Sequence, residues 1–341
     1  MASTRAPLAR FETNTGARIY RIPVETFDNH INNIYLILDR GTSTLVDVGS
    51  GLPQSVEDLH GGFEALATHF NERVRLESIQ HVVITHSHID HFGYVGWFQA
   101  HTGAAIYIHE LDARVLQNFE ERIVLASKDI RVFLERSGLD ASAREELETL
   151  YRSGKSFFKS VRLDRKLKDG ERLAHGYVVH HVPGHCPGQI CLQVDDVLFT
   201  ADHVLPRITP HQSPASITPF CGLELYLQSL EKVRRLPGIS LALPGHEEEI
   251  RDLRARIDAI AAHHRERLER VLEICVEPRT LLEVSRALFG ERGGYTRLLA
   301  LEEAGAHVEY LFQRGELGIA NVEEVAAQPN PVILYQRRHA T

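Results

Sequence analysis

Histidine and aspartate side chains crowd into one short segment, where His86, His88, Asp90 and His91 fall within six residues. Imidazole nitrogens and carboxylate oxygens are donors suited to Zn²⁺, Fe or Mn²⁺. Because side chains alternate along an extended chain, His86 and His88 are expected on one side of the loop, with Asp90 and His91 on the following turn. Crowding such groups costs desolvation and repulsion unless a cation compensates. The segment therefore predicts a loop that serves two metal ions side by side.

Three more candidate donors, His185, Asp202 and His246, each follow an apolar run that is typical of a β-strand. His185 and His246 come directly after Pro-Gly, a turn pair that can direct a side chain out of a strand end. A lone Pro-Gly-His is often only a turn, so these donors gain weight from their order and from the loop that precedes them. Together the candidate donors could complete two metal sites.

The elements that must position these donors are short strands rich in Val, Ile, Leu and Tyr and bounded by Gly, Pro or Asp. Residues 53–70 carry apolar side chains at helical spacing. Strands mixed with helices predict a layered α/β, or α+β, domain. The predicted strands are 17–24, 33–39, 42–48, 80–85, 104–109, 177–182, 190–194 and 197–200.

Two regions are predicted to be mainly helical. One is an insertion near 110–161 that could form a lid or pocket wall, and the other lies beyond residue 250. We expect His263 and His264 to be solvated on a charged helix there. The sequence thus predicts a catalytic domain over 1–250 and a C-terminal helical region over 251–341. The helices expected in the second region are 250–276, 278–288, 295–304 and 307–313.

The composition is that of an ordinary globular protein, with 341 residues of which 43% are hydrophobic and 25% charged. The formal net charge is −8, and residues 277–341 carry seven Arg against nine Glu, so nucleic acid is not expected as a partner. Four cysteines without a CxxC pair favour a reducing compartment. With neither a signal-like leader nor a membrane-length apolar run, we expect a cytoplasmic protein with no membrane partner.

The spacing His86-x-His88-x-Asp90-His91, followed in order by His185, Asp202 and His246, resembles the metallo-β-lactamase superfamily of hydrolases. The resemblance covers most of residues 17–250 and includes the strand before Asp47, which is similar to an early aspartate motif of the family. It implies a glyoxalase II-like catalytic domain folded as an αββα sandwich, two mixed sheets covered by helices. The tail resembles the winged-helix-like region of a subgroup, some members of which cleave single-stranded RNA.

The resemblance also implies roles for the donors. Asp47 would hold the ligand loop through hydrogen bonds. After the third histidine, similar proteins often have Thr or Ser, whereas this chain has Cys186, which we expect to be a small buried packing residue. The implied ligands are His86, His88 and His185 for the first ion, Asp90, His91 and His246 for the second, and Asp202 as a bridge between both.

Such a site implies hydrolysis by a metal-bridging hydroxide, with no covalent intermediate. The expected cofactors are two divalent ions, with Zn²⁺ ahead of Fe or Mn, and the expected substrate is a small ester, thioester or lactone. Asp90 and Asp202 are the predicted catalytic carboxylates, and His211 is a predicted substrate contact. Two alternatives stay open: an endoribonuclease or phosphodiesterase with the same dinuclear site, and a mononuclear iron enzyme similar to persulfide dioxygenases. The acidic tail is expected to pack or to form a homodimer.

Overall fold

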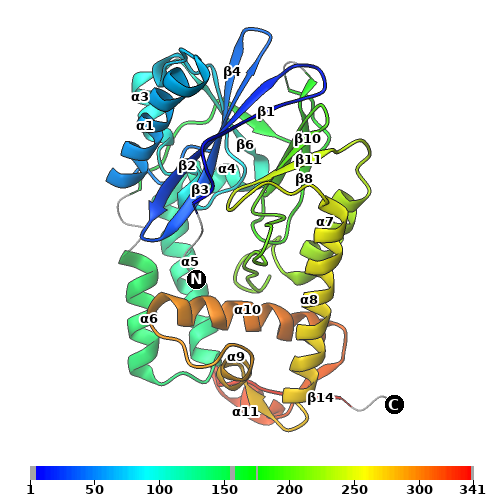
Figure 1. Cartoon of the computed structure of the whole chain (residues 1–341). Helices are drawn as coiled ribbons and strands as arrows, with labels where there is room; N and C mark the ends of the chain where they lie inside the picture. Colours follow the sequence, from blue (N-terminus) through cyan, green and yellow to red (C-terminus); the bar gives the residue numbers. More distant parts are fainter. Residues whose placement is uncertain (1–4, 154–157, 174–175, 339–341) are drawn as a thin grey trace. The chain divides into compact units, whose positions relative to one another are not determined.

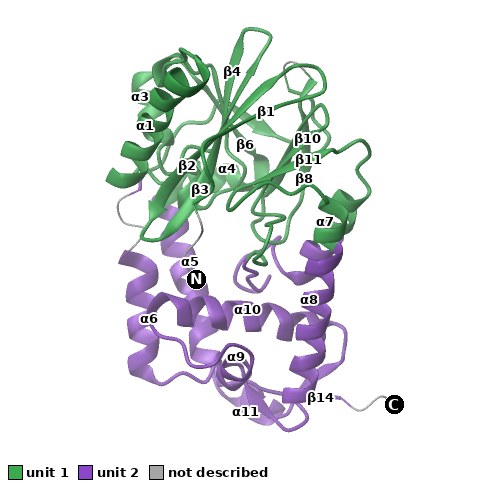
Figure 2. Cartoon of the chain, in the orientation of Figure 1, with its two compact units in different colours: residues 1–119, 159–210, 229–257 green, residues 120–158, 211–228, 258–341 purple. Residues whose placement is uncertain are grey.

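The computed structural model describes residues 5–153, 158–173 and 176–338 (Figure 1). The chain divides into two compact units (Figure 2). Unit 1 contains residues 1–119, 159–210 and 229–257, and unit 2 contains residues 120–158, 211–228 and 258–341. The predicted domains and helical insertion extend over residues 1–4, 154–157, 174–175 and 339–341, which lie outside the described residues. The boundary expected near residue 250 stays a prediction.

Unit 1 contains a seven-stranded sheet in the order β1-β2-β3-β4-β5-β6-β7. Its long antiparallel hairpin places Ile22 opposite Ile34, whereas the strands from β4 to β7 are parallel. Because parallel strands end at the same sheet edge, the segments that follow β4 and β5 come together. The strands are β1 (Ala9–Glu12), β2 (Arg18–Phe27), β3 (His30–Asp39), β4 (Thr42–Val46), β5 (His81–Val83), β6 (Ala105–His109) and β7 (Arg165–Leu167).

A second sheet of unit 1 has four strands in the order β11-β10-β9-β8. Apolar side chains from both sheets form one core, in which the rings of Tyr35 and Phe199 lie 5.2 Å apart at their centroids. This packing of two sheets over a shared core confirms the predicted layered α/β class. The strands are β8 (Val178–His181), β9 (Ile190–Val194), β10 (Val197–Ala201) and β11 (Leu241–Pro244).

Helix α1 (Pro53–Phe70) shows why the local sequence specifies this element so well. Proline stands at its first residue, where no backbone N–H is needed, and Asn71 ends it with a φ of 56°. Leu59, Phe63 and Leu66 repeat on one face and are buried. The other helices of unit 1 are α2 (Ile89–Phe92), α3 (Val95–His101) and α4 (Glu110–Gln117), while α7 (Leu223–Arg234) and α8 (Leu253–Ile274) contribute residues to both units.

Unit 2 is mainly helical and also contains a small sheet in the order β12-β14-β13. A capping box between Thr280 and Glu283 starts α9 (Leu281–Phe289). None of the helices in the described ranges is long and apolar enough to cross a membrane. The remaining elements are α5 (Phe119–Arg136), which begins at the last residue of a unit 1 segment, α6 (Ala141–Ser153), α10 (Gly294–Gln313), α11 (Val322–Ala327), β12 (Arg279–Thr280), β13 (Leu317–Ile319) and β14 (Leu334–Arg337).

The prediction of separate helices over 295–304 and 307–313 is wrong, because α10 is continuous through Gly305. Glycine is unfavourable inside a helix, so sequence reasoning favours a break at this position. Close packing explains the residue: a Cβ at Gly305 would lie 2.8 Å from Pro214 Cγ and 3.1 Å from Phe133 Cε2. The glycine therefore allows a close approach of neighbouring segments within unit 2.

Candidate metal centre

Strand ends position the expected donors in unit 1. β5 ends at Val83, three residues before His86, while β10 and β11 end just before Asp202 and His246. Ala201 and Glu247, the neighbours of these last two donors, are non-glycine residues with φ values of 45° and 66°. Left-handed backbone of this kind is strained and is retained where the surrounding structure requires it.

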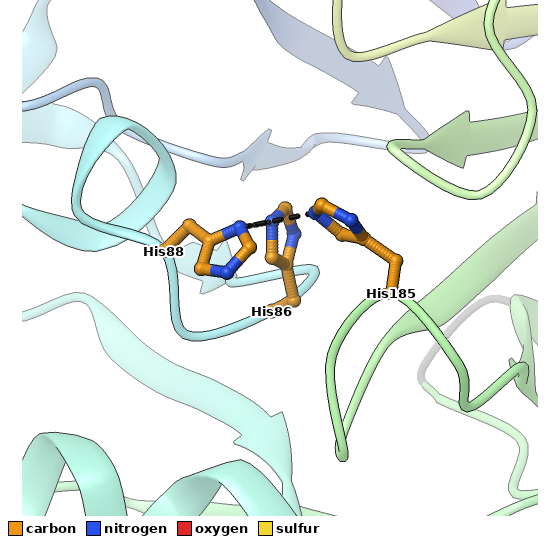
Figure 3. Close-up of side chains that lie close together, drawn as sticks. All are labelled: His86, His88 and His185. Atoms are coloured by element: carbon orange, nitrogen blue, oxygen red, sulfur yellow. Dashed lines mark hydrogen bonds between the residues drawn. The ribbon is translucent and has the colours of Figure 1, made fainter. Parts of the chain in front are cut away.

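The three histidines expected to bind the first ion converge from two loops (Figure 3). His88 Nδ1 lies 3.0 Å from His86 Nε2 and 3.0 Å from His185 Nε2. Tetrahedral zinc with Zn–N bonds near 2.0–2.1 Å would separate its nitrogen ligands by about 3.3 Å, close to this spacing. A neutral ring has a single N–H, so the three facing nitrogens cannot all be satisfied by one another.

The donors expected for the second ion also meet. Asp90 Oδ2 lies 3.4 Å from His91 Nε2 and 3.8 Å from His246 Nε2. The carboxylate of Asp202 lies between the two groups: Oδ2 is 3.3 Å from His246 Nε2 and 3.7 Å from His185 Nε2. One carboxylate is thus within reach of donors from both proposed ion sites.

Hydrogen bonds behind the donors orient the imidazole rings. The Thr85 hydroxyl donates to Asp47 Oδ2 (2.9 Å) and so accepts from His86 Nδ1 (3.1 Å). His91 Nδ1 donates to Asp47 Oδ2 (2.8 Å), and His246 Nδ1 donates to a backbone carbonyl of β3 (2.7 Å). Each bond fixes the proton on Nδ1 and directs the Nε2 lone pair into the site. Asp47 lies where the predicted loop-holding role requires, and that role stays a prediction.

Two residues of the β2–β3 hairpin contact the carboxylate of Asp90, and the sequence did not predict this role for them. His30 Nε2 donates to Asp90 Oδ2 (3.1 Å), and Asn32 Nδ2 donates to the same oxygen (3.0 Å). Their alternate spacing on one face of β3, just before the predicted strand over 33–39, is the only local signal that could have indicated them. Asn33, the next residue, donates instead to the carbonyls of Pro244 and Glu247, on either side of His246.

Burial and neighbouring charges divide the protonation states of the cluster. Burial, reinforced by the adjacent His185, lowers the pKa of His88 to about 3. Burial and the nearby His91 lower the pKa of His86 well below its usual value. Burial also opposes a charge on His91, but Asp90 and the other carboxylates outweigh it and raise the pKa of His91. One part of the cluster therefore offers neutral nitrogens, while the other attracts positive charge.

The donor chemistry of unit 1 fits divalent cations. Asp202 Oδ1 is buried and makes no hydrogen bond to any described residue, since His91 Nε2 is 3.5 Å away. An unsatisfied buried carboxylate oxygen is costly, and a cation beside it would remove that cost. Among the described residues of unit 1, donor atoms within 4.8 Å of one another form three groups, two of which share His86: His86, His88 and His185; His86, His91 and Asp202; and His30, Asp90 and His246.

A second buried histidine cluster lies in unit 2. His264 Nδ1 donates to His307 Nε2 (3.1 Å), so the expectation that His264 is solvated is wrong. Arg267 Nη1 donates to Glu303 Oε1 at 2.5 Å. His211 belongs to this unit, where its Nε2 donates to Glu302 (3.0 Å). Its expected contact with substrate stays a prediction.

Comparisons of the chain with known proteins agree with the motifs in its sequence. Residues 28–246, more than half of the chain, match the family described as the metallo-beta-lactamase superfamily. The chain therefore belongs to the metallo-beta-lactamase superfamily, which confirms the resemblance seen in its motifs. It is 24% identical over 299 residues to the protein named "Probable metallo-hydrolase YqjP" of Bacillus subtilis (strain 168), covering 82% of this chain and 88% of that one.

Two solved structures are similar over nearly the whole chain. A metallo-beta-lactamase family protein from Thermus thermophilus has a TM-score of 0.75 at 26% identity, covering 94% of this chain and 98% of that one. A beta-lactamase domain protein from Burkholderia ambifaria has a TM-score of 0.74 at 27% identity, covering 96% and 93%. The similarity therefore extends beyond the residues that match the family.

Proposed function

We propose that this chain is a dinuclear metal hydrolase that cleaves a small ester, thioester or lactone. The observation that carries the proposal is the position of Asp202, which lies 3.7 Å from His185 Nε2 and 3.3 Å from His246 Nε2. A carboxylate between two groups of donors is suited to bridge a pair of cations. Membership of the superfamily and the name of the Bacillus relative support hydrolysis as the reaction.

The residues that would hold the metal are those that converge in unit 1. When bound, such ions would lower the pKa of a metal-held water towards neutrality and polarise a substrate oxygen. Three imidazoles and a carboxylate favour Zn²⁺, with Fe or Mn as the ions to test beside it. His86, His88 and His185 would hold the first ion, Asp90, His91 and His246 the second, and Asp202 both.

The chain's own catalytic contribution would come mainly from Asp90. Its carboxylate would accept the proton of the attacking water and return it to the departing oxygen or sulfur. Asn32 and His30 donate to Asp90 Oδ2 and would hold the carboxylate in place during that transfer. Asp202, the other proposed catalytic carboxylate, would hold the two ion sites in a fixed position relative to each other. No side chain needs to act as a covalent nucleophile.

The test combines metal analysis with a substrate panel. We expect two ions per chain and turnover of acyl-thioesters or lactones, with no cleavage of single-stranded RNA or a phosphodiester. Cleavage of RNA or the phosphodiester, without turnover of the acyl substrates, would replace the proposed substrate class with the nuclease alternative. One iron per chain and oxygen uptake with a persulfide would instead favour the dioxygenase alternative.

The composition supports a proposal for the compartment and the partners of the protein. We propose a cytoplasmic protein that acts on a small molecule and has neither nucleic acid nor membrane as a partner. The acidic C-terminal region would serve as a packing element or as the contact of a homodimer. Size-exclusion chromatography coupled to light scattering would measure the oligomeric state, and a monomeric mass would remove the homodimer.

A further inference from the structure

Asp112 is a buried carboxylate in unit 1 that is not among the proposed metal ligands. It is the third residue of α4, and its side chain is fully buried. The first turn of a helix stabilises a negative charge, because its backbone N–H groups point towards it. Burial nevertheless raises the pKa of Asp112, against the hydrogen bonds that it accepts from Gly188 and Ser87. A carboxylate kept at this cost calls for an explanation.

The hydrogen bonds of Asp112 join the two loops that carry the first group of histidines. Its Oδ2 accepts from the backbone N–H of Ser87 (2.8 Å), the residue between His86 and His88. Its Oδ1 accepts from the backbone N–H of Gly188 (2.8 Å), three residues after His185. A single side chain therefore anchors both loops.

Cys186 adds a third contact, beside the expected packing role. It is buried, and its thiol donates to Asp112 Oδ2 (3.4 Å). The same sulfur lies 3.4 Å from Ser87 Oγ, on the other loop. Cys186, which stands where similar proteins often have Thr or Ser, thus belongs to the group of residues that joins the two loops.

Gly188 shows how closely the second loop approaches the carboxylate. A Cβ on Gly188 would lie 2.6 Å from Asp112 Cγ and 2.7 Å from Asp112 Cβ, distances at which atoms must move. The backbone N–H of Gly188 can reach Oδ1 because no side chain stands between them. The hydrogen bond to Asp112 therefore depends on glycine at position 188.

We propose that Asp112 is a positioning residue, which sets the spacing between His185 and the His86/His88 loop and thereby the affinity of the first metal site. A carboxylate can accept one backbone N–H bond on each of its two oxygens, as Asp112 does from Ser87 and Gly188. An amide at this position would turn an N–H₂ group towards one of the two N–H donors. This inference rests on the proposed function, because it assumes that the three histidines bind an ion.

The experiment is a Co²⁺ titration of metal-free protein, followed by visible absorption, on the wild type, Asp112→Asn and Gly188→Ala. Loss of a hydrogen-bond partner behind metal ligands typically lowers affinity about 10–100-fold. We expect a loss of this size at the first site in both variants, with a changed absorption band, and unchanged affinity at the second site. Glu110→Gln, an exposed carboxylate in the same helical turn, is the control and should match the wild type. His88→Ala and His246→Ala assign the absorption to the two sites.

The outcomes separate this inference from the proposed function. A wild type that binds no Co²⁺ would overturn the proposed metal sites, and this inference with them. A wild type that binds Co²⁺, with both variants retaining its first-site affinity and spectrum, would overturn the role of Asp112 alone. Equal weakening of both sites would also contradict it, since that result indicates general loss of structure. If Asp112→Asn does not fold, Gly188→Ala decides, because it disturbs the same contact from the other loop.

Discussion

The two units each contain a buried cluster of histidines and carboxylates, but the clusters balance their charges differently. In unit 1, the ion pairs that Asp90 and Asp202 form with described residues are all with histidines. In unit 2, Glu303 pairs with the guanidinium group of Arg267 at 2.5 Å. A permanently charged arginine compensates the second cluster from within the chain, whereas the first cluster is suited to an external cation.

The hydrogen bonds of the imidazole rings also differ between the two clusters. In unit 2, His307 Nδ1 donates to the Glu303 carbonyl (2.7 Å), so its Nε2 is free to accept from His264. In unit 1, by contrast, His88 Nδ1 faces two other ring nitrogens at 3.0 Å each. The two clusters have similar residue types, and they differ in the neighbouring arginine and in the direction of the lone pairs; we propose that these two features separate a metal site from a structural polar cluster.

The largest effect should come from removing a donor in unit 1. We expect His88→Ala to lower the bound metal from two ions to one and Asp202→Ala to lower it further, with turnover at background in both. Metal analysis and initial rates measure these outcomes, and His101→Ala, which removes an exposed histidine of unit 1, is the control. Full metal content with wild-type rates in either variant would show that the substituted residue is not a metal ligand, and the proposed difference between the two clusters would then fail.

The next effect should come from the arginine of unit 2. Arg267→Met leaves Glu303 buried without its cation, and the loss of one partner of such a pair costs about 3 kcal/mol of unfolding free energy. The two side chains are 15% and 11% exposed, so solvent screens the pair only weakly. Urea unfolding would measure the loss, with the exposed Arg265→Met as control.

The same variant also tests whether a metal ion can take the place of the arginine. Without Arg267, the group of His264, Glu303 and His307 lacks its internal cation, so excess Zn²⁺ should recover part of the lost stability. An Arg267→Met protein as stable as Arg265→Met would show that the arginine does not balance this cluster.

The smallest effect should be a pH dependence that arises from His264. Burial, against the opposing charge of Glu303, lowers the pKa of His264 to about 3, below the value of about 6.5 in an unfolded chain. Between these values the unfolded state binds a proton that the folded state does not, so stability is lost as the pH falls.

The variant His264→Gln removes this proton and should therefore weaken the pH dependence. We expect its unfolding free energy to fall by about 1 kcal/mol less than that of the wild type between pH 7.5 and 5.5. Metal content should stay at two ions per chain, since unit 2 is not expected to bind metal. The exposed His69→Gln is the control. Loss of an ion in His264→Gln would show that the second cluster is a metal site after all.

Local patterns determined much of this protein. The predicted helix over 53–70 coincides with α1, and the predicted strand over 190–194 coincides with β9, because periodicity and helix-terminal residues act over a few positions. The order and spacing of His86, His88, Asp90 and the later donors were sufficient to predict the family, and each of them lies after a strand.

Only the tertiary structure decided which distant residues support the donors. His30 and Asn32 have no local signal beyond their alternate spacing, and Asp112, which has none, reaches partners 25 and 76 positions away in the chain. The grouping of residues 120–158 and 211–228 with 258–341 likewise depends on contacts between segments remote in sequence. Arg267 beside Glu303 is a third case, since the two lie 36 positions apart. A sequence specifies such contacts only through the packing of the whole fold, so residue type can indicate a cluster but not how its charges are balanced.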